Sequence, residues 1–217
     1  MSLKKNVRAT ERLLFGLRTA NEGAVSYFAR RQNADLNAIY RTRPLWFYMF
    51  EPCFEYVNFP YEGGKCINLF YHLQEEHNID VNAVDVFGNT ALHLLTRAGE
   101  NDFARVLVES GADVNIPNDQ DETPFSLAIF TGNYHLATYF FDKGGAKVPS
   151  TLLSQFSDLV DQQSIEMRPW EAFSFLHHYV GMDVEAPKDA SGGSYAAHIR
   201  QVIKSFKLKG VKNERFK

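Results

Sequence analysis

The sequence lacks the marks of several protein classes. It has only two cysteines, Cys53 and Cys66, in 217 residues, which are too few for a disulfide-stabilised scaffold. It contains no apolar run of about 18 residues, so it predicts no membrane-spanning helix. The formal net charge of −3 argues against a chain that binds nucleic acid over its whole surface. Reduced thiols, with no signal-peptide core at the N-terminus, predict a cytoplasmic protein.

Recognisable catalytic motifs are also missing. Neither a GxxxxGK[ST] phosphate loop nor a GxGxxG dinucleotide motif occurs. Cys53 and Cys66 lack the CxxC spacing of a zinc site. His177 and His178 are neighbours on one predicted helix, where we expect them to face different sides. The sequence therefore predicts no enzyme, no cofactor, no metal and no small-molecule substrate, and only a Cys–His pair assembled by folding stays open.

The charge is unevenly distributed along the chain. Residues 198–217 hold seven Lys or Arg residues and one acid, Glu214, so the rest of the chain carries −9. Within this region YAAHIRQVIKSFK, residues 195–207, has an apolar face at helical spacing. Two interpretations stay open: a final helix that covers the body of the protein, or a basic element that contacts an acidic membrane or partner.

A shift of 33 residues aligns two blocks of the chain. Residues 85–117 read DVFGNTALHLLTRAGENDFARVLVESGADVNIP, and residues 118–149 read NDQDETPFSLAIFTGNYHLATYFFDKGGAKVP. The aligned pairs include Thr90 with Thr123, Gly99 with Gly132, and Gly111 with Gly144. The threonines can cap a first helix. Gly99 and Gly132 allow a tight turn between antiparallel helices, and Gly111 and Gly144 can end the second helix in the left-handed conformation. An internal repeat of this length predicts a stack of helical units.

GNTALHLL, followed by a glycine and then LVESGADVN, resembles an ankyrin repeat, a unit of one β-turn and two helices. The match is strong for 85–117 and good for 118–149, where Ser126 replaces the histidine. The resemblance implies an all-α solenoid of ankyrin repeats with β-turn fingers. It also implies that His93 bonds locally and holds adjacent repeats.

Weaker repeat endings extend the array to about five units with divergent ends. They read NADLN at 33–37, HNIDVN at 77–82 and GMDVE at 181–185. The predicted units are an N-terminal cap at 1–37, a divergent unit at 38–84, ankyrin repeats at 85–117 and 118–149, and a divergent unit at 150–186. Residues 187–217 are predicted as a flexible joint and the basic C-terminal helix. The basic N-terminus fits the first helix of the cap better than a mitochondrial transit peptide.

The unit at 38–84 contains a surplus of about a dozen residues rich in aromatic side chains. RPLW at 43–46 occupies the helix-start position, so 44–50 and 66–76 should be the two helices of this unit. The insertion near 51–64, EPCFEYVNFPYEGG, then lies between them. Its rings either form a local core or present a docking loop; they are Phe54, Tyr56, Phe59 and Tyr61.

The resemblance implies a monomeric, non-catalytic interaction module, scaffold or adaptor that binds a partner protein through its concave face. Ankyrin repeats hold partners with the finger tips and the first helix of each unit. The matching positions are Val86, Phe87, Asn89, Arg97, Ala98, Asp119, Gln120, Glu122, Phe130 and Thr131. We expect Phe87 and Phe130 to be exposed contact anchors, because apolar rings there replace polar side chains; packing against a neighbouring element is the alternative.

Two further functions stay open at this stage. The chain could be an effector that an intracellular bacterium secretes into the host cytosol, with activity in its divergent regions. It could also be an adaptor that reaches a membrane or nucleic acid through the basic C-terminus, although the net negative charge disfavours nucleic acid.

Overall fold

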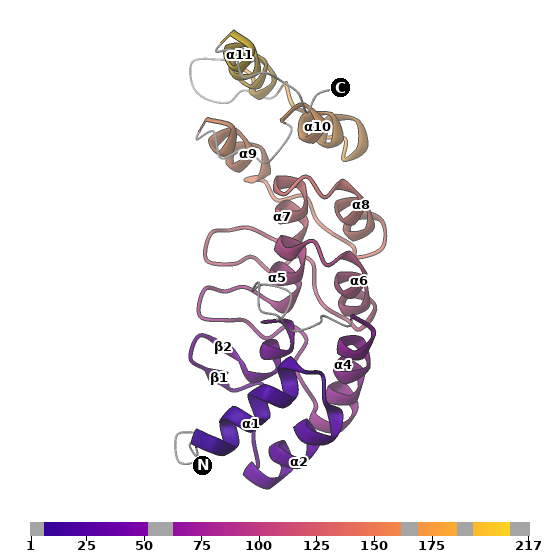
Figure 1. The fold of residues 1–217 in the computed structure, drawn as a ribbon. Coiled ribbons are helices and arrows are strands. Elements are labelled where there is room, and N and C mark those ends of the chain that lie inside the picture. Colours follow the sequence, from indigo (N-terminus) through magenta and orange to yellow (C-terminus); the bar gives the residue numbers. More distant parts are fainter. Residues whose placement is uncertain (1–6, 52–62, 162–168, 186–192, 209–217) are drawn as a thin grey trace. The chain divides into compact units, whose positions relative to one another are not determined.

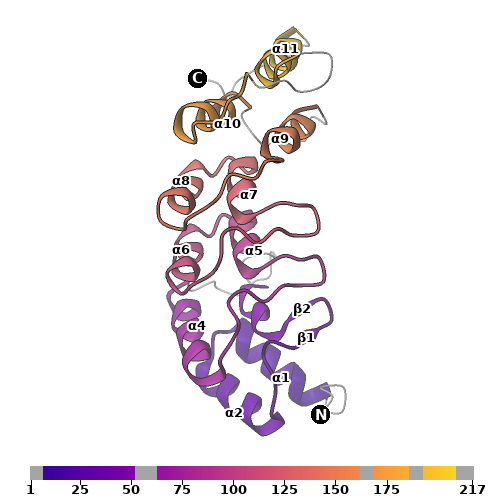
Figure 2. The same ribbon diagram turned by 180° about the vertical axis from the view of Figure 1, so that it is seen from behind.

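A computed structural model of the chain describes residues 7–51, 63–161, 169–185 and 193–208. Its contacts divide the chain into two compact units, Met1–Pro124 and Phe125–Lys217, which are described separately (Figures 1 and 2). Helices predominate in the described part of each unit, as the sequence predicts. The division falls inside the predicted repeat 118–149, so the finger of that repeat belongs to the N-terminal unit and most of its helical part to the C-terminal unit.

The N-terminal unit combines paired helices with projecting loops. Its helices are α1 (Val7–Arg18), α2 (Glu22–Gln32), the 3₁₀ helix η2 (Leu45–Phe50), α4 (Gly63–His77), α5 (Ala91–Ala98) and α6 (Asn101–Glu109). The strands β1 (Ile39–Tyr40) and β2 (Arg43–Pro44) pair antiparallel, with Ile39 opposite Pro44. This hairpin and the loops before α5 and after α6 project to the same side (Figures 1 and 2). The hairpin was not predicted from the sequence.

Local capping residues set the ends of the helices. The Thr90 side chain accepts the His93 N–H, and His93 in turn accepts the Thr90 N–H, so both ends of this capping box are satisfied at the start of α5. Gly99 ends α5 with φ +76°, a conformation that glycine adopts without steric cost. The capping role of Thr90 and the tight turn predicted at Gly99, between α5 and α6, are thus confirmed.

One hydrogen-bonded turn recurs at the predicted repeat endings. The aspartate side chain of each ending accepts the backbone N–H two residues later, which closes a tight turn. The four pairs are Asp35–Asn37 at 2.9 Å, Asp80–Asn82 at 2.9 Å, Asp113–Asn115 at 2.8 Å and Asp183–Glu185 at 3.1 Å.

Asparagine side chains connect consecutive endings in the N-terminal unit. Asn37 Oδ1 accepts the Asp80 N–H at 2.7 Å, and its Nδ2 donates to the Asn78 carbonyl at 3.2 Å. Asn82 Oδ1 accepts the Asp113 N–H at 2.8 Å. Each ending is therefore tied to the next by a side chain that bonds backbone.

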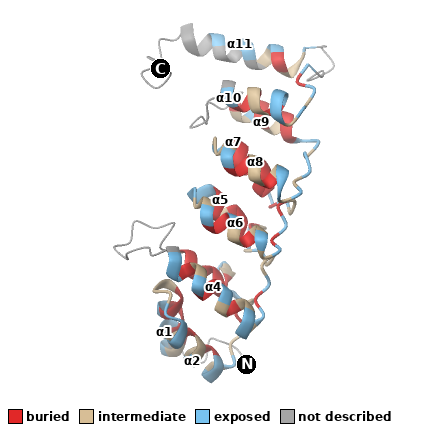
Figure 3. Ribbon diagram, turned by 90° about the vertical axis from the view of Figure 1, so that its right-hand side faces the viewer, coloured by how far each residue is buried: buried red, intermediate tan, exposed pale blue. Residues whose placement is uncertain are grey.

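The core of the N-terminal unit is aromatic. The ring of Phe103 lies 5.1 Å from that of Phe50 and 5.8 Å from that of Phe70, both edge to face. All three rings are buried, and α4 and α6, which carry Phe70 and Phe103, show buried residues beside exposed ones (Figure 3). Edge-to-face pairs add about 0.5–1.5 kcal/mol each beyond the area that they bury.

The first half of the aromatic run belongs to this core. Every residue of η2, Leu45–Phe50, is buried. Such a segment has no solvent face and so lacks the periodicity of an amphipathic α-helix. The expected helix at 44–50 forms as a 3₁₀ helix that begins one residue later. The insertion rings Phe54, Tyr56, Phe59 and Tyr61 lie outside the described residues.

The C-terminal unit is helical in its described residues. Its elements are α7 (Pro124–Phe130), α8 (Tyr134–Asp142), α9 (Leu152–Asp161), α10 (Pro169–Ser174), the π-helical turn η3 (Phe175–Tyr179) and α11 (Tyr195–Leu208). Rings connect three of these elements: Phe141 lies 5.9 Å from Phe125 and 6.0 Å from Tyr179. The Tyr179 hydroxyl also donates to Asp142 Oδ2 at 2.6 Å.

The basic C-terminal helix makes contacts inside its own unit. α11 packs against α9 and α10. Arg200 on α11 reaches Glu185 Oε1 at 3.2 Å, and its guanidinium lies 6.0 Å from the centre of the Phe173 ring. These contacts favour the covering interpretation of this helix over the membrane interpretation.

Phe103→Ala should destabilise the protein strongly, by about 3–5 kcal/mol, because it opens a cavity between the Phe50 and Phe70 rings. The matched control is Phe15→Ala: Phe15 is 58% exposed on α1, and its loss should cost less than about 0.5 kcal/mol. Urea denaturation followed by circular dichroism measures both. Equal losses of stability in the two variants would contradict the aromatic core.

Candidate functional site

The second finger, residues 83–90, is a tight loop organised by one carboxylate. Asp85 Oδ1 accepts the Phe87 N–H at 2.8 Å and the Asn89 N–H at 2.9 Å. The backbone of Asp85 also donates to the Asn89 carbonyl at 2.9 Å. The Asp85 carboxylate is thus hydrogen-bonded within the loop, at its base. The side chains of Val86 and Phe87 lie at the tip of the loop.

The third finger, residues 116–123, repeats this arrangement 33 residues later with an amide. Asn118 Oδ1 accepts the Gln120 N–H at 2.9 Å and the Glu122 N–H at 3.0 Å. Asp121 takes the left-handed conformation, with φ +57°, at the position that corresponds to Gly88, with φ +74°. The two loops therefore share one backbone design with different side chains at their tips.

Backbone hydrogen bonds connect the fingers into a row. The Val86 N–H donates to the Thr42 carbonyl of the first finger, residues 38–44, at 2.9 Å. The Asp119 N–H of the third finger donates to the Phe87 carbonyl at 3.1 Å. The tips of the three fingers are thus fixed beside one another, all within the N-terminal unit.

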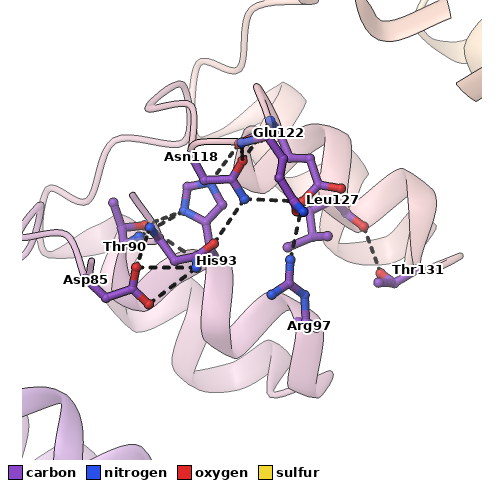
Figure 4. Close-up of polar contacts among 10 residues, drawn as sticks. Asp85, Thr90, His93, Arg97, Asn118, Glu122, Leu127 and Thr131 are labelled. Atoms are coloured by element: carbon purple, nitrogen blue, oxygen red, sulfur yellow. Dashed lines mark hydrogen bonds and ion pairs between the residues drawn. The ribbon is translucent and has the colours of Figure 1, made fainter. Parts of the chain in front are cut away.

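His93 supports the third finger from below (Figure 4). Its Nδ1 accepts the Thr90 N–H at 3.1 Å, and its Nε2–H donates to the Glu122 carbonyl at 2.9 Å. These partners require the neutral imidazole with the proton on Nε2. Burial lowers the pKa of His93 to about 4, against a smaller opposing effect of the Glu122 hydrogen bond. The predicted structural role of His93 is confirmed.

Two further side-chain contacts join the second and third fingers (Figure 4). Asn118 Nδ2 donates to Asn89 Oδ1 at 3.0 Å in the interior. Arg97 on α5 forms an ion pair with Glu122 at 3.3 Å. Because both groups of this pair are partly exposed, we expect it to contribute orientation more than stability.

The exposed tips form a surface that we call the fingertip strip: Ile39, Arg41, Arg43, Val86, Phe87 and Asp119. Ile39, Val86 and Phe87 are 49%, 50% and 60% exposed. Arg41 and Asp119 are also exposed. Large apolar side chains held on a rigid loop in water are typical of a binding surface.

The structure brings together part of the predicted contact set. Val86, Phe87, Asp119 and Gln120 are exposed at the tips of neighbouring fingers, and Arg97 and Ala98 are exposed at the end of α5. Thr131 is exposed in the C-terminal unit, where its hydroxyl donates to the Leu127 carbonyl at 3.0 Å (Figure 4).

Two predicted contact residues are buried instead. Phe130 is only 9% exposed, so the expectation of an exposed ring there is wrong and packing is its role. It closes the short helix α7, where every residue from Pro124 to Phe130 is buried. Asn89 is 6% exposed and is occupied by Asp85 and Asn118, which leaves it no partner-facing role.

Sequence reasoning missed the first finger as part of the surface. The hairpin β1–β2 places Ile39, Arg41 and Arg43 beside the second finger. The alignment of RPLW with the helix-start motif could have predicted this finger. It places YRTR, residues 40–43, at the position that residues of the second finger occupy in the next repeat. Irregular spacing of this repeat hid the correspondence.

A serine and a histidine lie close together in the described residues, away from the fingers. Ser26 Oγ lies 2.5 Å from His72 Nε2, beside a pocket of about 450 Å³ lined by Ser26, Tyr27, Arg30 and Arg31. Arg30 is paired with Glu76, and Arg31 donates to the Tyr27 hydroxyl at 2.7 Å. The polar side chains that line this pocket thus already have partners, two of them on α4.

No cluster of three or more metal-ligating side chains occurs among the described residues. No helix in the described part of the chain is long and apolar enough to cross a bilayer. The rings of His177 and His178 lie 4.6 Å apart and both are exposed, so the expectation that they face different sides is wrong.

Fingers, paired helices and the ladder of repeat endings define a helical-repeat protein. Residues 61–151 match the family model described as ankyrin repeats in three copies. The chain therefore carries ankyrin repeats, and the resemblance seen in its sequence is confirmed. Ankyrin repeats are a general protein–protein interaction module.

Curated relatives are similar to a short part of the chain. SH3 and multiple ankyrin repeat domains protein 2 of Homo sapiens is 38% identical over 63 residues, 29% of this chain and 3% of that protein. Neurogenic locus notch homolog protein 1 of Xenopus tropicalis is 47% identical over 49 residues, 23% of this chain and 2% of that protein. Oxysterol-binding protein-related protein 1 of Homo sapiens is 38% identical over 65 residues, 30% of this chain and 7% of that protein. The chain thus spans a small fraction of the length of these relatives.

Mild acid should destabilise the N-terminal unit through His93. Because its pKa is about 4 in the folded protein and about 6.5 in the unfolded chain, the unfolded chain binds more protons between these values. The free energy of unfolding is fully retained above about pH 6.5 and falls as the pH drops toward 4. Between about pH 7 and pH 5.5 His93 should account for a loss of about 1 kcal/mol.

Urea denaturation at both pH values measures this loss in the native protein and in His93→Gln, which cannot titrate. The exposed His135→Gln variant is the control and should behave as the native protein does. An unchanged pH dependence in His93→Gln would contradict a buried neutral imidazole.

Gly88→Ala should destabilise the fingers more than Gly99→Ala. Both glycines have positive φ, +74° and +76°, so alanine costs about 1–2 kcal/mol at either position. At Gly88 the added carbon would also lie 2.9 Å from Asp119 N and Oδ1, whereas at Gly99 it would meet nothing within 4 Å. Thermal melts compare the two, and an equal loss would show that the second and third fingers are not in close contact.

Proposed function

We propose that this protein recognises a partner protein without catalysis, and that Val86 and Phe87 on the second finger are the centre of the contact. The observation that carries the proposal is the exposure of these two side chains, 50% and 60%. Aromatic side chains at the centre of an interface commonly supply a large share of the binding free energy.

The rigidity of the finger adds to this argument. The Phe87 N–H bonds the Asp85 carboxylate at 2.8 Å, and its carbonyl accepts the Asp119 N–H at 3.1 Å. A residue fixed at both backbone groups loses little conformational entropy on binding, so more of the contact energy appears as affinity. The backbone position of Phe87 is thus set before the partner binds.

The proposed contact extends from this centre to neighbouring tips and to α5. Asp119 and Gln120 lie on the next finger, and Arg97 and Ala98 are exposed at the end of α5. The aromatic insertion near 51–64 is included on its sequence alone. It would be a second contact element that offers Phe54, Tyr56, Phe59 and Tyr61.

Phe87→Ala should reduce partner binding by roughly thirtyfold, which corresponds to a loss of about 2 kcal/mol for a central ring. The immobilised chain is used to capture proteins from cell lysate, and the retained proteins are quantified by mass spectrometry. Phe15→Ala removes a ring of similar exposure, 58%, from α1 and is the matched control.

The proposal requires proteins that the native chain and Phe15→Ala retain and that Phe87→Ala loses. Circular dichroism first establishes that both variants are folded. If Phe87→Ala retains everything that the native chain retains, the second finger is not the centre of recognition and the proposal fails.

A further inference from the structure

The three fingers of the N-terminal unit differ in charge in a regular order. The first finger carries Arg41 and Arg43 and no acid between residues 38 and 44. The second finger has one acid, Asp85, whose carboxylate is occupied by its own loop. The third finger carries Asp119, Asp121 and Glu122.

This order is a property of the folded surface as well as of the sequence. Thr42 on the first finger bonds Val86, and Phe87 on the second finger bonds Asp119, at 2.9 and 3.1 Å. A segment that crosses the tips therefore meets positive charge, then the apolar pair Val86 and Phe87, then negative charge.

Aromatic rings orient the positive groups without cancelling their charge. The Arg41 guanidinium lies 5.6 Å from the centre of the Tyr40 ring, and that of Arg43 lies 5.6 Å from the centre of the Tyr48 ring. A cation over a ring face is attracted by the ring quadrupole and keeps its full charge. At the other end, Arg97 compensates Glu122, while the exposed Asp119 faces solvent at its finger tip.

We infer that the fingertip strip binds an extended segment of a partner protein in which acidic residues, an apolar side chain and basic residues follow one another. The acidic part meets Arg41 and Arg43, the apolar side chain covers Val86 and Phe87, and the basic part meets Asp119. This inference rests on the proposed function and adds the charge order of the partner.

The order of charges on the fingertip strip also restricts the class of partner. A uniformly anionic surface, such as a nucleic acid backbone or an acidic membrane, would be repelled at the third finger. A uniformly basic segment would be repelled at the first finger. Complementary charges fix the register of a bound segment and select against other partners more than they add affinity.

The test begins with random peptides of about twelve residues, which span about 40 Å when extended, displayed on phage. They are selected against the native 217-residue chain and then counter-selected against Phe87→Ala. We expect the peptides that depend on Phe87 to carry acidic residues on one side of a central apolar residue and basic residues on the other.

Charge reversals then test which end of the peptide meets which finger. For a selected peptide, Arg41→Glu and Asp119→Lys should each weaken binding about tenfold at low salt, near 0.01 M, and less near 0.15 M, where screening is stronger. A peptide with its acidic part made basic should bind Arg41→Glu better than the native chain. Glu75→Lys, a reversal at an exposed position on α4, should leave binding unchanged.

The outcomes separate the inference from the function on which it rests. Peptides that depend on Phe87 but show no charge order, or no rescue by the reversed peptide, overturn the inference and leave the proposed function in place. If no selected peptide depends on Phe87, the proposed function fails and the inference fails with it.

Discussion

The N-terminal unit depends on side chains that reach from one repeat to the backbone of the next. The His93 imidazole is the most buried example: it closes the capping box of α5 with one nitrogen and holds the Glu122 carbonyl with the other. Repeats contact only their neighbours, so no distant contact can correct the register if such a bond is lost. The buried, neutral state of His93 is therefore a condition for the position of the third finger.

A division of labour follows from this constraint. Buried rings such as Phe50 and Phe103 supply the stability of the N-terminal unit, while polar groups at the base of each finger, such as Asp85 and Asn118, fix the loops. The tips contact one another through backbone hydrogen bonds, which do not depend on residue type. Their side chains are free to differ from finger to finger, as Arg41, Phe87 and Asp119 do.

The repeat period, the caps and the turns could be predicted because they depend on local sequence. Thr90 and Gly99 act within one turn of their own helix, and the Asp-x-Asn endings close within three residues. Burial of Phe130 could not be predicted, because it depends on packing around a helix of seven residues that is buried on every side. For the same reason the uniformly apolar segment 45–50 gave no sign that it winds as a 3₁₀ helix. The first finger was not predicted as part of the surface because it joins the second finger through the Thr42 carbonyl. Every residue has such a backbone group, so the sequence does not mark it.

Three links between repeats in the N-terminal unit join a side chain to backbone: Asn37, Asn82 and His93 each contribute a side chain, and the following repeat contributes a backbone N–H or carbonyl. A backbone group is present whatever residue occupies the position. The following repeat can therefore accumulate substitutions without losing this hydrogen bond, and a duplicated repeat would offer the same backbone group. Such an array is open to evolutionary change in length and in surface while its connections stay the same.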